Sequence, residues 1–104
     1  FPNCVSSEAE EEERAVAPIT ATEPQWQQLT QWIVQQKDWE VVEASPSFIQ
    51  AIVKTPLLGF RDDVLLRFEA GEEVIHVRSS SRLGYSDLGA NRERVELLRA
   101  LINQ

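Results

Sequence analysis

The polar side chains that could do chemistry are concentrated in residues 78–94, which read RSSSRLGYSDLGANRER. This stretch holds four arginines and four serines, together with a tyrosine, an aspartate and an asparagine. Alternate residues of a strand share a face, so Arg78 and Arg82 would project from the same side. Two guanidinium groups in that arrangement can bind a carboxylate or a phosphate through paired hydrogen bonds. The stretch therefore indicates either a polar site or a rigid polar junction.

A helix is predicted to begin within the last part of this stretch, and the free backbone N–H groups at a helix start attract anions. Asn91 and Arg92 fall in the first turns, where a cation opposes the helix dipole unless an anion or a carboxylate offsets it. Ser79 and Ser81 continue the inward face of the preceding strand, where small hydroxyl side chains can line a pocket. The candidate ligand- or partner-binding residues are Asp62, Asp63, Arg78, Ser79, Ser81, Arg82, Tyr85, Asp87, Asn91 and Arg92.

Asp62 and Asp63 offer these arginines partners within the chain. A hairpin with its turn near residues 70–72 would place position 63 opposite about position 79, beside the arginines. Three interpretations follow from this placement: a structural network of salt bridges and hydrogen bonds, an anion or small-ligand site, and a docking surface for another protein.

The residue types do not assemble a catalytic constellation. His76 is the only histidine, it falls within a predicted strand, and no G-x-S-x-G nucleophile motif occurs. Asp62 and Asp63 are adjacent, so strand geometry turns them to opposite faces and disfavours a catalytic carboxylate pair. The single cysteine, Cys4, excludes an internal disulfide and a multi-cysteine metal site. We expect it to pack as a small residue, and a reactive thiol or an intermolecular bridge is the alternative. We expect no catalytic residue, no metal and no cofactor.

The net charge of −7 is distributed unevenly along the 104 residues. Residues 1–43 carry nine acids and two bases, whereas residues 44–104 carry eight of each. Nucleic acid is a poor partner for such a chain, because phosphate neutralisation needs a basic surface. No apolar run approaches the roughly 20 residues of a membrane helix, so we expect the chain not to span a membrane.

Hydrophobic periodicity predicts a helix, four strands and a second helix. The predicted ranges are 23–38 for the first helix, 39–44, 48–54, 63–69 and 73–81 for the strands, and 87–102 for the second helix. Thr22 and Gln25 resemble a capping box, and Ser86 or Asp87 would cap the second helix. In the first helix the tryptophans are predicted to lie in the core. In the second helix both Arg94 and Arg99 are predicted to point outward.

Tight turns between consecutive strands favour an antiparallel meander. Two amphipathic helices covering one face would complete an α+β two-layer sandwich with a four-stranded sheet, in the order α-β-β-β-β-α. Residues 1–21 contain a run of glutamates and two prolines, which predicts an extended acidic N-terminal arm. The single α+β domain would then span residues 22–104.

Several motifs follow one another along the chain: PNCVSS at 2–7, DDV at 62–64, VRSSSR at 77–82, GYSDLG at 84–89 and NR at 91–92. In this order they resemble domain-of-unknown-function family 1499. The resemblance implies an occurrence in bacteria, cyanobacteria and plastids, often behind a signal or transit segment. Because the numbering begins at Phe1, we expect such a segment to have been removed. The resemblance also implies that Cys4 belongs to a family motif.

The resemblance further implies a thylakoid-lumenal or periplasmic location, with a cytoplasmic one as the alternative. The expected function is that of a non-catalytic accessory or binding domain, which docks on a larger protein assembly through its arginine-rich face or its N-terminal arm. A photosynthetic membrane complex is the assembly that the resemblance suggests. The alternative is an anion- or small-ligand-binding domain, or a cryptic enzyme, that uses Arg78, Arg82 and Arg92.

Overall fold

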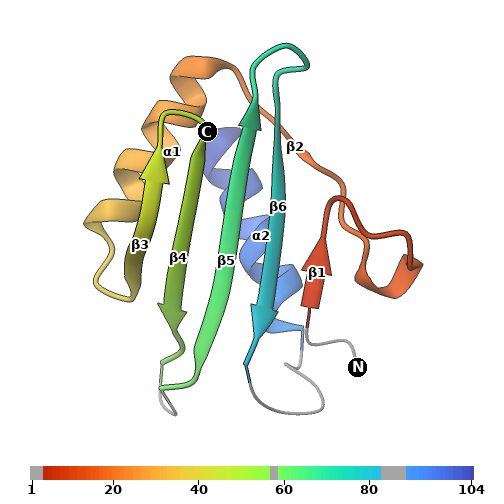
Figure 1. The fold of residues 1–104 in the computed structure, drawn as a ribbon, viewed down its shortest axis with the longest axis vertical. Coiled ribbons are helices and arrows are strands. Elements are labelled where there is room, and N and C mark those ends of the chain that lie inside the picture. Colours follow the sequence, from red (N-terminus) through yellow and green to blue (C-terminus); the bar gives the residue numbers. More distant parts are fainter. Residues whose placement is uncertain (1–3, 57–58, 83–88) are drawn as a thin grey trace.

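The computed structural model describes residues 4–56, 59–82 and 89–104. Strands and helices follow one another along the chain, with a short 3-10 helix near the start (Figure 1). The elements are β1 (Cys4–Ser6), η1 (Glu12–Arg14), β2 (Ile19–Thr20), α1 (Glu23–Gln35), β3 (Trp39–Ser45), β4 (Phe48–Lys54), β5 (Arg61–Glu69), β6 (Val74–Ser81) and α2 (Ala90–Ile102).

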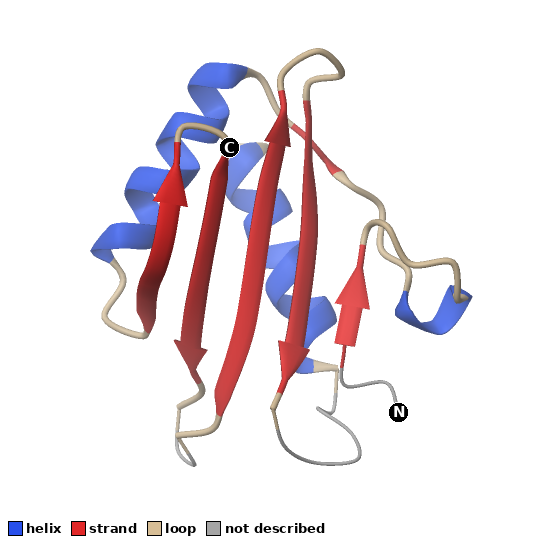
Figure 2. Cartoon of the chain, viewed as in Figure 1, coloured by secondary structure: helices blue, strands red, loops and turns tan. Residues whose placement is uncertain are grey.

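The architecture is α+β, with one antiparallel sheet and two helices that lie on the same face of it (Figures 1 and 2). The strands follow the order β1-β6-β5-β4-β3, and β2 also pairs with β6. The predicted meander forms the body of this sheet, since β3 to β6 each pair with the next strand in antiparallel register. Asp63 lies opposite Ser80, one residue from the predicted register.

The prediction of a four-stranded sheet is wrong, because the described residues form a sheet of six strands. The two additional strands come from the residues predicted as an arm. In β1, Val5 pairs with Ser79, and in β2, Ile19 pairs with Ile75. Both strands are too short to show alternation in the sequence. They form because the edge of β6 offers free backbone partners, and because Val5 and Ile19 bury their side chains in the core.

The first helix shows the predicted start and a core-facing stripe. Thr22 and Gln25 form the predicted capping box, with Gln25 Oε1 accepting from the backbone N–H of Thr22 at 2.8 Å. The side chain of Trp26 is buried and stacks on Phe68 of β5, with 5.7 Å between ring centroids. The half-buried Trp32 packs edge-on against Trp39. The helix ends at Gln35, before the predicted residue 38.

The second helix begins later than predicted, at Ala90, and its N-cap is Gly89 rather than Ser86 or Asp87. Gly89 has a φ of 81°, a left-handed conformation that glycine adopts without steric cost, and it has no side chain of its own with which to cap the helix. Residues 83–88, which include both predicted caps, lie outside the described residues. The apolar stripe of α2 is buried against the sheet through Val95 and Leu98.

The stacked position of Trp26 generates a stability prediction. We expect Trp26→Ala to lower the free energy of unfolding by about 3–5 kcal/mol, because it leaves a cavity between α1 and β5. Val34→Ala, on the exposed side of the same helix, should change that free energy by no more than about 0.5 kcal/mol. Urea unfolding followed by tryptophan fluorescence and circular dichroism measures both; equal losses would contradict the assignment of Trp26 to the core.

Candidate functional site

A buried ion pair joins the sheet to the second helix. Asp62 lies near the start of β5, in phase with Val64 and Leu66, so its side chain enters the helix-covered face. Arg94 of α2 reaches it there, with Nη2 2.8 Å from the carboxylate Oδ2. Asp62 is 1% exposed, and the side chain of Arg94 is 11% exposed. An ion pair so poorly hydrated needs further hydrogen bonds to offset its desolvation.

Three neutral side chains supply those hydrogen bonds. Ser79 Oγ donates to Asn91 Oδ1 at 2.7 Å, and Arg94 Nη1 donates to both of these oxygens at 2.9 Å. Asn91 Nδ2 donates in turn to Ser81 Oγ at 2.9 Å. In the part of the chain that the structure describes, no buried side-chain nitrogen or oxygen lacks a partner. These five residues, Asp62, Ser79, Ser81, Asn91 and Arg94, form a satisfied network, called here the buried network.

The outward placement predicted for Arg94 is therefore wrong, and this residue is the member of the buried network that sequence reasoning missed. The signal that could have found it lies in β5. The alternation of Val64, Leu66 and Phe68, extended back by one step, puts Asp62 on the core face. A carboxylate on that face requires a cation from the layer above it, because an unpaired buried charge is very costly.

The neighbouring Asp63 faces the other side of the sheet, as its alternation with Asp62 predicts. There it forms a two-point ion pair with Arg82, whose Nε and Nη2 both lie 2.9 Å from the carboxylate oxygens. The hydrogen bonds from Arg82 lower the pKa of Asp63, and those to Asp63 raise the pKa of Arg82. Arg78 lies on the same face, is exposed, and approaches Ser80 Oγ at 3.5 Å.

Two further arginines of α2 hold the N-terminal segment. Arg92 donates to the carbonyl oxygen of Ala15 at 3.0 Å. Arg99 donates to the carbonyl oxygens of Pro18 and Ala17 at 2.9 and 2.8 Å, so its predicted outward orientation is wrong as well. Guanidinium groups satisfy backbone carbonyls that the irregular chain around β2 leaves without a sheet partner. The second helix thus fastens the N-terminal segment to the body of the domain.

The structure divides the candidate residues into three groups. Asp62, Ser79, Ser81 and Asn91 meet in the buried network, and Asp63, Arg78 and Arg82 lie on the open face of the sheet. Arg92 lies in the helix layer against Ala15 and does not converge with Arg78 and Arg82. Tyr85 and Asp87 lie outside the described residues.

A second polar cluster ties the N-terminal segment to the open face. Glu8 forms an ion pair with Arg67 of β5 at 2.9 Å, and the hydrogen bond from Arg67 lowers the pKa of Glu8. His76 lies between Ser7 Oγ at 3.3 Å and a Glu69 carboxylate oxygen at 3.2 Å. The single histidine therefore has structural partners on both ring nitrogens.

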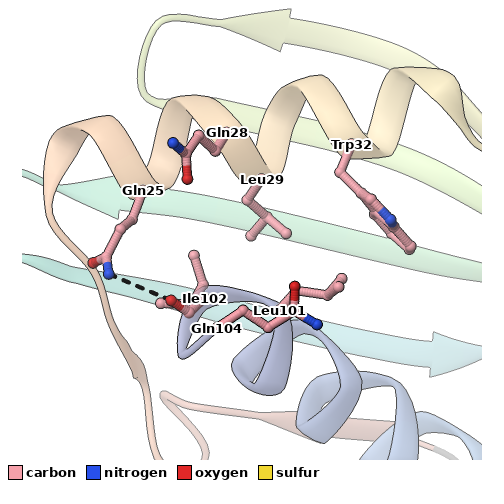
Figure 3. A pocket seen from close by; sticks show the side chains of 7 residues that line it. All are labelled: Gln25, Gln28, Leu29, Trp32, Leu101, Ile102 and Gln104. Atoms are coloured by element: carbon pink, nitrogen blue, oxygen red, sulfur yellow. Dashed lines mark hydrogen bonds between the residues drawn. The ribbon is translucent and has the colours of Figure 1, made fainter.

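A small cleft lies between the two helices, near the C-terminal end of α2 (Figure 3). Its volume is about 190 Å³, below the roughly 300 Å³ at which ligand pockets usually begin. It is lined by Gln25, Gln28, Leu29, Trp32, Leu101, Ile102 and Gln104. Gln25 Nε2 donates across it to the carbonyl oxygen of Ile102 at 3.3 Å, which joins the helices (Figure 3). The lining carries no charged side chain and no evident nucleophile.

The fold and the buried network define an α+β domain in which the buried polar side chains of the described residues all have hydrogen-bond partners. The chain belongs to the protein family of unknown function DUF1499, whose family model matches residues 1–102. No curated protein and no solved structure gives a significant match to it. Over residues 4–56, 59–82 and 89–104, no helix is long and apolar enough to cross a membrane, and no group of three acidic, histidine or cysteine side chains is arranged to hold a metal.

Breaking the buried network from one side should destabilise the domain strongly. We expect Arg94→Ala to lower the free energy of unfolding by about 3–5 kcal/mol, because it leaves the Asp62 carboxylate buried without its cation. The double substitution Asp62→Leu with Arg94→Met should recover most of that loss. Arg82→Ala, which breaks the exposed pair with Asp63, should cost no more than about 1 kcal/mol. Urea unfolding compares all three; a loss below 1 kcal/mol for Arg94→Ala would contradict the structural role.

The ion pair of Asp63 predicts a pH dependence of stability. Its folded-state pKa lies below the ordinary value of 3.8, so the pair stabilises the fold above that pH and loses its effect as the pH falls through the folded-state pKa. The difference in free energy of unfolding between wild type and Asp63→Asn should therefore shrink when the pH falls from 6 to 3. Urea unfolding at half-unit pH steps measures it. A difference independent of pH would exclude Asp63 as the titrating group.

Proposed function

We propose that this domain is a non-catalytic accessory subunit, which docks on a larger protein assembly through the open face of its sheet. The observation that carries the proposal is a contrast between the two faces. On the helix-covered face the buried polar groups of the described residues, those of the buried network included, already have hydrogen-bond partners. On the other face, no helix of the described chain covers the strands (Figures 1 and 2).

The open face has the composition of a protein-binding surface. Half-buried apolar side chains, Phe48, Ile52 and Leu65, lie on adjacent strands β4 and β5. The strand register places Leu65 directly opposite the exposed Arg78. An apolar centre with arginine beside it and a polar rim is typical of surfaces at which proteins bind one another.

Arg78 is an exposed cation beside the apolar centre of this face. Its neighbour Arg82 is engaged by Asp63, and Arg67 is engaged by Glu8 and Glu69. Among the described residues, Arg78 forms no ion pair, and its contact with Ser80 is long. A partner that brings an acidic group to Arg78 would therefore bind without displacing an existing ion pair.

The assembly that we propose is the one suggested by the family resemblance, a complex at a photosynthetic membrane, reached in the thylakoid lumen or the periplasm. Its support is the resemblance together with a docking face that lacks a catalytic constellation. Under this proposal, Leu65 and Arg78 on the open face would contact the assembly.

The second candidate function is the binding of a small anion by Arg78 and Arg82, with or without associated chemistry. The exposed guanidinium of Arg78 favours it, because it lies on the same face as Arg82. Arg92 would not take part, since it contacts Ala15 from the helix layer. If this small-anion site were catalytic, the reacting group would have to come from a residue outside the buried network.

Charge reversal at Arg78 tests the docking proposal. In native gels of solubilised membranes from the source cells, we expect the tagged wild-type chain to migrate with a large assembly. Arg78→Glu should reduce the bound fraction at least about tenfold, because it places a like charge against an acidic partner group. Lys37→Glu reverses an exposed charge in the loop before β3 and should leave the bound fraction unchanged.

A wild-type chain that migrates alone, or an Arg78→Glu chain that remains fully bound, would overturn the proposal. Equal melting temperatures of the three chains would exclude unfolding as the cause of any loss. If the wild-type chain migrates alone but binds inorganic phosphate, and Arg78→Ala removes that binding, the small-anion function is the better account.

A further inference from the structure

The two edges of the sheet are finished in different ways. At one edge, the N-terminal segment folds back over β1. The carbonyl oxygen of Ser6 accepts from the backbone N–H of Val16 at 3.2 Å, and Ser6 forms a parallel bridge with Ala15. At the other edge, β3 pairs with β4 alone within the described chain. An unpaired strand edge presents backbone donors and acceptors to which another extended chain can bind.

A groove of about 400 Å³ lies between α1 and the end of β3. The helix contributes Gln27, Thr30 and Val34, which share one side because they are spaced at three and four residues. The strand contributes Ala44 and Ser45, both exposed. A chain that paired with β3 would therefore have this helix surface beside its own side chains.

Apolar side chains are exposed where an added strand would lie. Val34 of α1 is 62% exposed and Val42 of β3 is 54% exposed, more than any other large apolar side chain of the described residues. Buried Trp26 and Ile49 also line the groove. Apolar side chains at alternate positions of an extended segment would bury this surface.

The charges along this edge are acidic. Glu23 lines the groove, whereas Glu40 and Glu43 are exposed on β3 and lie on the open face of the sheet, opposite Ile52 and Gln50. No basic side chain lines the groove among the described residues. An extended segment that carries lysine or arginine between its apolar residues would therefore be complementary in charge.

We propose that β3 accepts an extended, cationic and apolar segment of a partner protein as an additional strand, held in the groove beside α1. This inference rests on the proposed docking function and names a partner chemistry at a surface distinct from Arg78. The register of β3 with β4 shifts between Val41 and Glu43, and such a bulge twists the strand. The added strand is therefore short and pairs with the half of β3 that follows the bulge.

The same edge is unsuited to a second copy of this chain. Antiparallel pairing of two β3 strands would bring the acidic side chains of Glu40 and Glu43 from both copies together, and the whole chain carries a net charge of −7. Like charges on adjacent strands destabilise their pairing. A cationic partner removes this repulsion.

The test uses the full chain and an octapeptide of alternating valine and lysine, blocked at both ends. We expect saturable binding in calorimetry and slower amide exchange within Trp39–Ser45 by NMR, because added pairing protects the edge. A peptide with glutamate in place of lysine should bind at least about tenfold more weakly. Val34→Lys, which places a cation in the groove, should weaken binding of the valine–lysine peptide by a similar factor.

Leu97→Lys is the matched control, because it makes the same kind of change at an exposed apolar residue of α2 (49% exposed) outside this groove. It should leave peptide binding unchanged. The Arg78→Glu chain should still bind the peptide, because Arg78 lies on β6 and two strands, β5 and β4, separate it from β3. This result would distinguish the inference from docking on the open face. No binding of the valine–lysine peptide, equal binding by the Val34→Lys chain, or amide protection outside β3 would overturn the proposal. Dimerisation of the free chain through β3 would assign the edge to a second copy instead.

Discussion

The ion pair between Asp62 and Arg94 constrains the rest of the structure. Both charges lie in a layer that water hardly reaches, so each would be strongly destabilising without the other. Their pairing determines where α2 can lie on the sheet, because the guanidinium must reach a carboxylate on β5. Ser79 and Asn91 then complete the hydrogen bonds of the guanidinium, and Asn91 binds Ser81 as well.

The position of α2 in turn determines how the N-terminal segment is held. Arg92 and Arg99 project from the helix to the carbonyl oxygens of Ala15, Ala17 and Pro18. With this segment in place, β1 and β2 extend the sheet at β6, and Val5 and Ile19 join the core. The guanidinium groups of α2 thus bind a carboxylate and backbone carbonyl oxygens of this chain, rather than gathering in one ligand site. Arg78 is exposed on the open face and forms no ion pair within the described chain.

The surfaces of this domain are therefore better candidates for a binding site than its enclosed cleft. The cleft between the helices is small and neutral, and it is spanned by the hydrogen bond from Gln25 to Ile102 (Figure 3). The open face and the edge of β3 both leave groups that a partner could satisfy: apolar side chains around Leu65 on the face, and backbone donors and acceptors on the edge.

The local pattern of the sequence determined the body of this fold. The range of β4 was predicted without error, and the capping box of Thr22 and the core position of Trp26 were predicted correctly. Each of these features depends on neighbours a few residues away, through strand alternation, helical spacing or a cap. The pairing of Arg82 with a neighbouring aspartate was within reach for the same reason, because it needs only the hairpin of β5 and β6.

Tertiary structure alone decided the remaining features. The strands β1 and β2 are too short to show an alternation of apolar and polar residues. They form because β6 offers unpaired backbone groups at its edge, and β6 lies about 70 residues after β1 along the chain. The burial of Arg94 depends on a carboxylate 32 residues earlier, and neither residue shows in its own element that the other will lie beside it. The division of Arg78, Arg82 and Arg92 between two layers likewise follows from how α2 packs on the sheet. Local sequence patterns specify elements, whereas the burial of charges and the pairing of short strands are settled by contacts between segments that are distant along the chain.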